Sequence, residues 1–201
     1  MTALGSGIDQ SQMSMSYFSL ASFRISVAIL FIFSLLCTQI PLFNYLGFEF
    51  SALTSVIASF LAGIVTLALW RNPKSLEKAK VETFIAVSTR TCLLLLVIPF
   101  ALMSLNGFFV KNCAFAEGAS FFLLMSVPAV LFANAIAFFI ATNFDRWNKT
   151  LFAVFFVVLL LHIPLVTFTG IQIFAFNPIM GFFPGFTYDE TLNVMTRLLA
   201  Y

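Results

Sequence analysis

The sequence predicts an all-α integral membrane protein: a bundle of five transmembrane helices with a short amphipathic helix at the C-terminus. The 201 residues are 61% hydrophobic and only 9% charged, whereas a soluble domain has about 25% charged residues. The mean hydropathy is +1.05. Five intervals between charged residues are also long and apolar enough to cross about 30 Å of hydrocarbon. Together these observations exclude a water-soluble fold and a disordered chain.

The five predicted spans cover about residues 25–40, 51–70, 84–104, 120–142 and 151–169. The first follows Arg24 and ends before Pro41, and the second lies between Glu49 and Arg71. The third holds Arg90 within its first turns. Each span is expected to be helical despite its many β-favouring Phe, Val and Ile residues, because lipid offers no hydrogen-bond partners to an open backbone.

The chain divides into three predicted regions. Residues 1–20 are expected to form a mobile tail, residues 21–170 the five-span membrane domain, and residues 171–201 a Pro/Gly/Phe-rich segment with the amphipathic helix. Residues 1–23 contain no Lys or Arg and the first apolar run has no convincing cleavage site. The first span is therefore read as retained and not as a signal peptide.

Basic residues predict the orientation. Eight of the ten Lys and Arg residues fall on the face that holds the N-terminus, and two fall on the other. The positive-inside rule then predicts a cytoplasmic N-terminus and an extracytoplasmic C-terminus in a cell membrane, which we take to be a bacterial inner membrane. The lipid bilayer is the expected partner, together with other membrane or extracytoplasmic proteins. A net charge of +2 is too small for nucleic-acid binding.

The uncharged stretch 150–188 is long enough for two spans, so a sixth span over 170–188 stays open. Helix breakers argue against it and favour an interfacial or re-entrant turn at the outer face: Asn177, Pro178, Gly181, Pro184 and Gly185. Thr187 and Glu190, with Asp189 between them, then match a capping box that starts the amphipathic helix. That helix stops in the middle of its pattern at Tyr201, as expected of a fragment of a longer protein.

Three polar residues inside the spans are candidates for function. Asn134 lies deep in the fourth span and His162 lies in the fifth, two residues before Pro164, while Arg90 lies near the cytoplasmic boundary. Desolvating such groups is costly, so they often mark functional sites. The simpler interpretations are snorkelling for Arg90, helix-to-helix hydrogen bonding for Asn134 and a packing role for His162.

The sequence contains no recognisable motif for a catalytic, metal or cofactor site. The sequence contains no serine-hydrolase, zinc-protease or phosphate-loop motif and no pair of carboxylates within a span. The three cysteines lack metal-ligand or CxxC spacing. We therefore expect no catalytic residue, no metal and no cofactor.

Three stretches carry a resemblance: IPLFNYLGFEFSAL at 40–53, NCAFAEGASFFLL at 112–124 and FNPIMGFFPGFTYDE at 176–190. Together they resemble the N-terminal multispan region of uncharacterised bacterial integral membrane (envelope) proteins, in which a larger extracytoplasmic domain follows the last helix. The resemblance implies that the third stretch lies at the outer membrane face and leads toward such a domain. It supplies no catalytic motif.

These observations favour a membrane anchor or scaffold for an extracytoplasmic domain or partner, without chemistry of its own. A small transporter or permease subunit is the alternative, with Asn134, His162 and the broken segment at Asn177 and Pro178 lining its pathway. A membrane-embedded lipid-modifying enzyme is a second alternative, since Glu117, His162 and Asp189 are the residues it would draw on.

Overall fold

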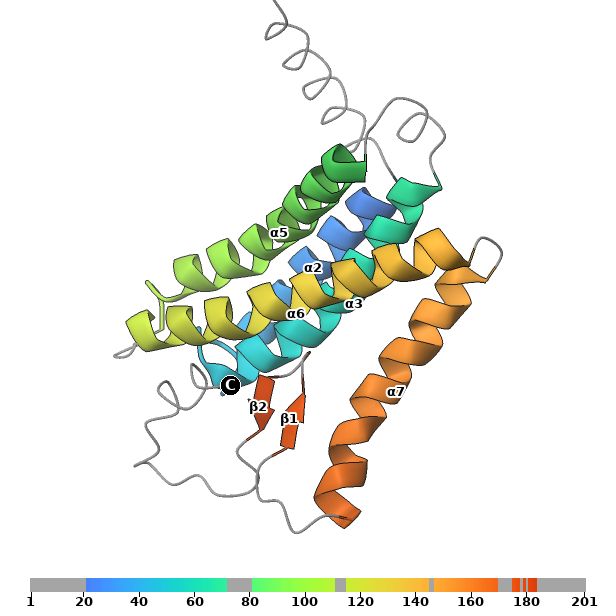
Figure 1. Cartoon of the computed structure of the whole chain (residues 1–201). Helices are drawn as coiled ribbons and strands as arrows, with labels where there is room; N and C mark the ends of the chain where they lie inside the picture. The colour runs from blue at the N-terminus through green and yellow to red at the C-terminus, as the bar shows by residue number, and fades with distance from the viewer. Residues whose placement is uncertain are drawn as a thin grey trace, which may run out of the picture.

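The computed structural model describes residues 21–71, 81–110, 115–144, 147–169, 175–177, 179 and 181–183. Within these ranges it contains five α-helices and two short strands (Figure 1). These elements are α2 (Ala21–Thr38), α3 (Phe48–Trp70), α5 (Val81–Asn106), α6 (Phe115–Asn143), α7 (Asn148–Thr169), β1 (Ala175–Asn177) and β2 (Gly181–Phe183). The predicted N-terminal tail and C-terminal amphipathic helix lie outside the described residues.

The helical membrane bundle predicted from the sequence is confirmed. Among the described residues, α2, α3, α5 and α6 are long and apolar enough to cross a membrane, and Asn148–His162 of α7 form a shorter apolar helix. The five helices begin three to five residues before the predicted spans. Such extensions are physically reasonable, because a 29-residue helix such as α6 is about 44 Å long and exceeds the hydrocarbon thickness.

Two helices continue through an internal proline. Pro99 lies inside α5 and Pro128 inside α6. A proline removes one backbone hydrogen bond and would break an isolated helix in water. In a membrane bundle, neighbouring helices and Ser or Thr side chains compensate for that loss, so both helices continue.

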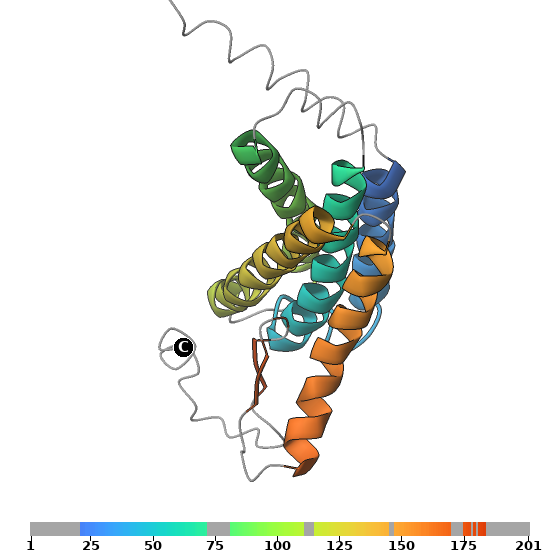
Figure 2. The ribbon, with the colours of Figure 1, turned by 45° about the vertical axis from the view of Figure 1, so that its right-hand side comes forward.

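Helix α3 is the centre of the bundle. It packs most extensively against α6 and also contacts α2, α5 and α7, and Figures 1 and 2 show it running through the middle of the other helices. Buried positions make up 14 of its 23 residues, and many of them are Ser, Thr, Ala or Gly. Small side chains let the surrounding backbones approach closely, which is how helices associate in lipid.

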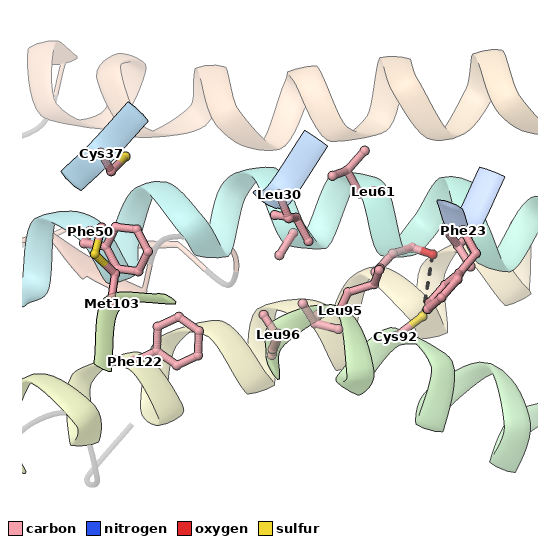
Figure 3. Packing of buried hydrophobic residues seen from close by; sticks show 14 of the residues in the cluster. Phe23, Leu30, Cys37, Phe50, Leu61, Cys92, Leu95, Leu96, Met103 and Phe122 are labelled. Atoms are coloured by element: carbon pink, nitrogen blue, oxygen red, sulfur yellow. Dashed lines mark hydrogen bonds between the residues drawn. The ribbon is translucent and has the colours of Figure 1, made fainter. Parts of the chain in front are cut away.

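The buried apolar residues form two clusters. The larger one joins α2, α3, α5 and α6, and Figure 3 shows part of it around Leu30, Phe50, Met103 and Phe122. Phe50 stacks on Phe122 with 6.3 Å between the ring centroids. The second cluster packs Phe152 of α7 against α3 and α6, and it also includes the described residue Ile179. Burial of this kind fixes the neighbours of each helix.

Large apolar side chains cover the outside of the bundle. Leu36 on α2 is 60% exposed, Val97 on α5 is 55% exposed and Val158 on α7 is 58% exposed. A soluble protein rarely exposes so much contiguous apolar surface, whereas lipid solvates it favourably. The exposed faces are therefore the lipid-facing surfaces of a membrane protein.

A β-hairpin follows α7. Strands β1 and β2 pair antiparallel, with Ala175 opposite Phe183, Phe176 opposite Phe182 and Asn177 opposite Gly181. The hairpin contacts α7 and lies beside the end of α3 that begins at Phe48 (Figures 1 and 2). The described part of 170–188 thus forms strands and not a sixth helix.

Candidate functional site

A buried polar network joins the three helices at the heart of the bundle. The Thr66 hydroxyl on α3 donates to the Asn134 side-chain oxygen on α6 over 2.7 Å. The Asn134 amide nitrogen in turn donates to the Thr89 hydroxyl on α5 over 3.1 Å. Asn134 is only 6% exposed. Both ends of its amide group are therefore satisfied, as a buried polar group requires.

Cys92 completes this network. Its sulfur lies 3.5 Å from the Thr66 hydroxyl and 3.8 Å from the Asn134 side-chain oxygen. Its thiol also donates to the Ala62 carbonyl oxygen over 3.6 Å, the contact drawn as a dashed line in Figure 3. The neighbours of the thiol are hydroxyl, amide and carbonyl groups, none of which is a base or a cation that would stabilise a reactive thiolate. The network is thus suited to joining helices and not to acid–base or nucleophilic chemistry.

A row of buried hydroxyls continues along α3 from this network. The Ser51 hydroxyl donates to the Gly47 carbonyl oxygen over 2.6 Å, and the Ser59 hydroxyl donates to the Val56 carbonyl oxygen over 3.0 Å. Hydrogen bonds to the helix's own backbone satisfy these groups without a neighbouring helix. Among the described residues, the buried Thr54 hydroxyl has no hydrogen-bond partner.

Ser55 connects α3 to the hairpin. Its hydroxyl lies 2.7 Å from the carbonyl oxygens of both Ala52 and Ile179, and it shares its single proton between them. Ile179 is 1% exposed and packs in the second apolar cluster. Ser55 is seven residues from the start of α3, or about 10 Å along the helix axis. Ile179, which lies between the two strands, is therefore inserted into the bundle, where its non-helical backbone carbonyl is covered by protein.

The structure separates the three candidate residues within the spans. Asn134 lies inside the buried network, whereas Arg90 and His162 are exposed on α5 and α7. Arg90 directly follows Thr89, so one helical position separates the lipid-facing surface from the network. Within the described ranges, no group of three His, Cys, Asp or Glu side chains is placed to hold a metal ion.

The outer-face candidates are only partly described. Asn177 and Gly181 pair with each other across the hairpin, as the last residue of β1 and the first of β2. Pro178, Pro184, Gly185, Asp189 and Glu190 lie outside the described residues.

Charged side chains divide between the two ends of the bundle. The end where α3 terminates at Arg71, here called the Arg71 end, also holds Arg24, Lys149 and Arg90 on the starting halves of α2, α7 and α5. One described acid, Glu82 in the first turn of α5, lies at this end too. The opposite end holds Glu49 and Glu117 in the first turns of α3 and α6. Counted over the described residues, all four Lys and Arg residues belong to the Arg71 end.

Sequence reasoning missed the partners of Asn134 and of the hairpin turn. Nothing in the sequence distinguishes Thr66, Thr89 and Cys92 from other residues of apolar spans. The one indication of such a network was the Asn134 amide, which needs two hydrogen-bond partners when it is buried. Ser55 and Ile179 are 124 positions apart, and neither residue carries a local pattern that indicates the contact.

Comparison with known proteins gives no further assignment. No family model, no curated protein and no solved structure matches the chain. The class of protein is therefore the one that the fold itself defines, a helical integral membrane protein.

Proposed function

We propose that the chain is a membrane anchor or scaffold that holds its C-terminal segment against the bundle at the extracytoplasmic face. The observation that carries this proposal is the docking of the hairpin turn, in which Ile179 is buried and its carbonyl oxygen accepts from Ser55. A docked turn fixes the position of whatever follows α7, because burying an Ile side chain stabilises the contact by about 1.5–3 kcal/mol.

The charge distribution supports the orientation in this proposal. The Arg71 end carries the described Lys and Arg residues, so it is the end that the positive-inside rule assigns to the cytoplasm. The hairpin lies at the opposite end, beside the start of α3 (Figure 1). In a bacterial inner membrane, an extracytoplasmic protein or domain would meet the bundle there.

The interior supports a structural role as well. Asn134 is the candidate polar residue that the sequence places deep in a span. Its side chain accepts a hydrogen bond from Thr66 and donates one to Thr89. A satisfied network of this kind holds helices together and adds about 0.6 kcal/mol per interaction.

A small transporter or permease subunit is the second candidate. It is favoured by the hairpin itself, because non-helical backbone at membrane depth also lines the substrate sites of transporters. The buried Thr54 hydroxyl, which has no hydrogen-bond partner among the described residues, also favours a transporter.

Complementation of a strain that lacks the protein distinguishes the two candidates. The anchor predicts that a Thr66→Val/Asn134→Leu variant rescues as well as the native chain, because both changes remove polar groups that serve packing only. It also predicts that Ser55→Ala/Ile179→Asp fails, because a buried carboxylate expels the hairpin turn. Membrane levels of both variants are matched by immunoblotting. The opposite pattern, with the network variant inactive and the hairpin variant active, would establish the transporter.

A further inference from the structure

Arg90 lies on an apolar face of α5 that no other described helix covers. The side chains at helical spacing around it are exposed: Ala86 one turn before it, and Leu94 (45%) and Val97 (55%) after it. These neighbours belong to the lipid-facing surface of the bundle. An arginine on such a surface requires a specific partner, because an isolated charge in hydrocarbon costs about 2.5–3.5 kcal/mol or more.

The described residues supply no such partner within reach. Glu49 and Glu117 lie at the opposite end of the bundle. Glu82 lies on α5 but eight residues before Arg90, which is about 12 Å along the axis and beyond the reach of the usual three- or four-residue ion pair. The remaining described charges of the Arg71 end, Arg24, Arg71 and Lys149, have the same sign as Arg90.

The position of Arg90 along α5 sets the depth of its charge. The helix has 26 residues and is about 39 Å long, so the hydrocarbon core begins about three residues inside each end. Arg90 then lies roughly 9 Å below the boundary at the Arg71 end. Helical side chains lean toward the helix N-terminus, which here is that nearer boundary. An extended Arg90 side chain therefore brings its guanidinium close to the level of lipid phosphates and esters.

We propose that Arg90 binds the phosphate of an anionic glycerophospholipid. Its planar guanidinium matches two phosphate oxygens at once, and the lipid's net negative charge neutralises a cation that the described residues leave unpaired. The small Ala86 side chain leaves room for the headgroup one turn above Arg90. The acyl chains lie along the exposed Leu94 and Val97 side chains.

Native mass spectrometry of the full chain, released from nanodiscs of phosphatidylcholine with a minority of phosphatidylglycerol, tests this proposal. The wild-type protein is expected to retain phosphatidylglycerol in preference to phosphatidylcholine. Arg90→Gln is expected to weaken that binding about fivefold, the factor that corresponds to ~1 kcal/mol for one well-placed Arg. Lys149→Gln is the matched control, because it removes a charge from the same end at an exposed helix start, and its retention should equal that of the wild type.

Arg90→Lys extends the test if the Gln variant does not accumulate. Lysine keeps the charge but loses the two-pronged contact, so its retention is expected to fall below the wild type. Equal phosphatidylglycerol retention in the wild type and in an Arg90 variant overturns the proposal. Unchanged lipid retention in an Arg90 variant, together with loss of a dimer peak, also overturns the proposal, because Arg90 would then pair with a second copy of the chain.

Discussion

Replacing Gly118 with alanine is expected to destabilise the bundle by about 3 kcal/mol or more. Gly118 lies in α6, where a Cβ atom would meet the Leu46 carbonyl oxygen at 1.8 Å and its carbon at 2.7 Å. Both atoms belong to the backbone of the turn before α3, so no side-chain rotation relieves the overlap. Either the turn or the start of α6 must move. Reversible unfolding in detergent micelles measures the change.

Gly107→Ala is the matched control for this prediction. Gly107 follows α5 at the same end of the bundle, and an added Cβ would come no closer than 3.2 Å to the Ser104 carbonyl oxygen. The expected change in unfolding free energy is within about 1 kcal/mol. Equal losses in the two variants would contradict the close approach of α6 to the turn at Leu46.

Gly63→Ala is expected to lower the unfolding free energy by about 1–3 kcal/mol through a different clash. A Cβ at Gly63 would lie 2.0 Å from the Phe152 ring, which belongs to α7 and is 1% exposed. The ring also stacks on Phe60, with 6.1 Å between the centroids, and tilts against Phe156 at 6.0 Å. Because it is confined by these neighbours, the ring cannot swing aside without a cost.

Phe152→Leu supplies the rescue for this prediction. The smaller side chain leaves space for the alanine methyl group, so Gly63→Ala should cost less in the Phe152→Leu background than in the wild type. The same unfolding assay gives the coupling energy from the four proteins of the double-mutant cycle. Additive effects would mean that α7 does not press on Gly63.

The helices could be predicted from the sequence because membrane insertion depends on a local property. Each span is an apolar interval long enough to cross the hydrocarbon, and the β-favouring Phe, Val and Ile residues do not change that outcome. The exact ends of the helices were harder to predict from the sequence. Helix α6 begins at Phe115 and not near residue 120, with Glu117 in its first turn, where the helix dipole favours an acid outside the hydrocarbon.

Only part of the buried network could be predicted from the sequence. Asn134 was identifiable because an amide inside an apolar span needs partners. The identity of those partners depends on how α3, α5 and α6 rotate against one another, and no local pattern in the sequence determines that rotation. The Thr66 hydroxyl also bonds to the Ala62 carbonyl oxygen of its own helix, as Thr91 does to the Val87 carbonyl oxygen. The sequence therefore does not distinguish threonines that also reach a neighbouring helix from those that do not.

The hairpin illustrates the same limit. Asn177 and Gly181 indicated that helix would not continue there, and the structure pairs these two residues across β1 and β2. That the turn between them docks on α3 follows from a contact between Ser55 and Ile179. Such distant contacts are set by tertiary packing, so the sequence pattern predicted a helix break without predicting its place in the bundle.

The most direct test of the account is the accessibility of a cysteine at position 179. In a background with Cys37, Cys92 and Cys113 changed to alanine, Ile179→Cys is compared with Phe109→Cys, whose native side chain is 89% exposed. Docking predicts that a water-soluble maleimide labels position 179 roughly tenfold to a hundredfold more slowly, since burying the native side chain contributes about 1.5–3 kcal/mol. Adding Ser55→Ala should speed that labelling. Equal labelling rates at the two positions would contradict the insertion of the hairpin turn into the bundle, and with it the proposed anchor.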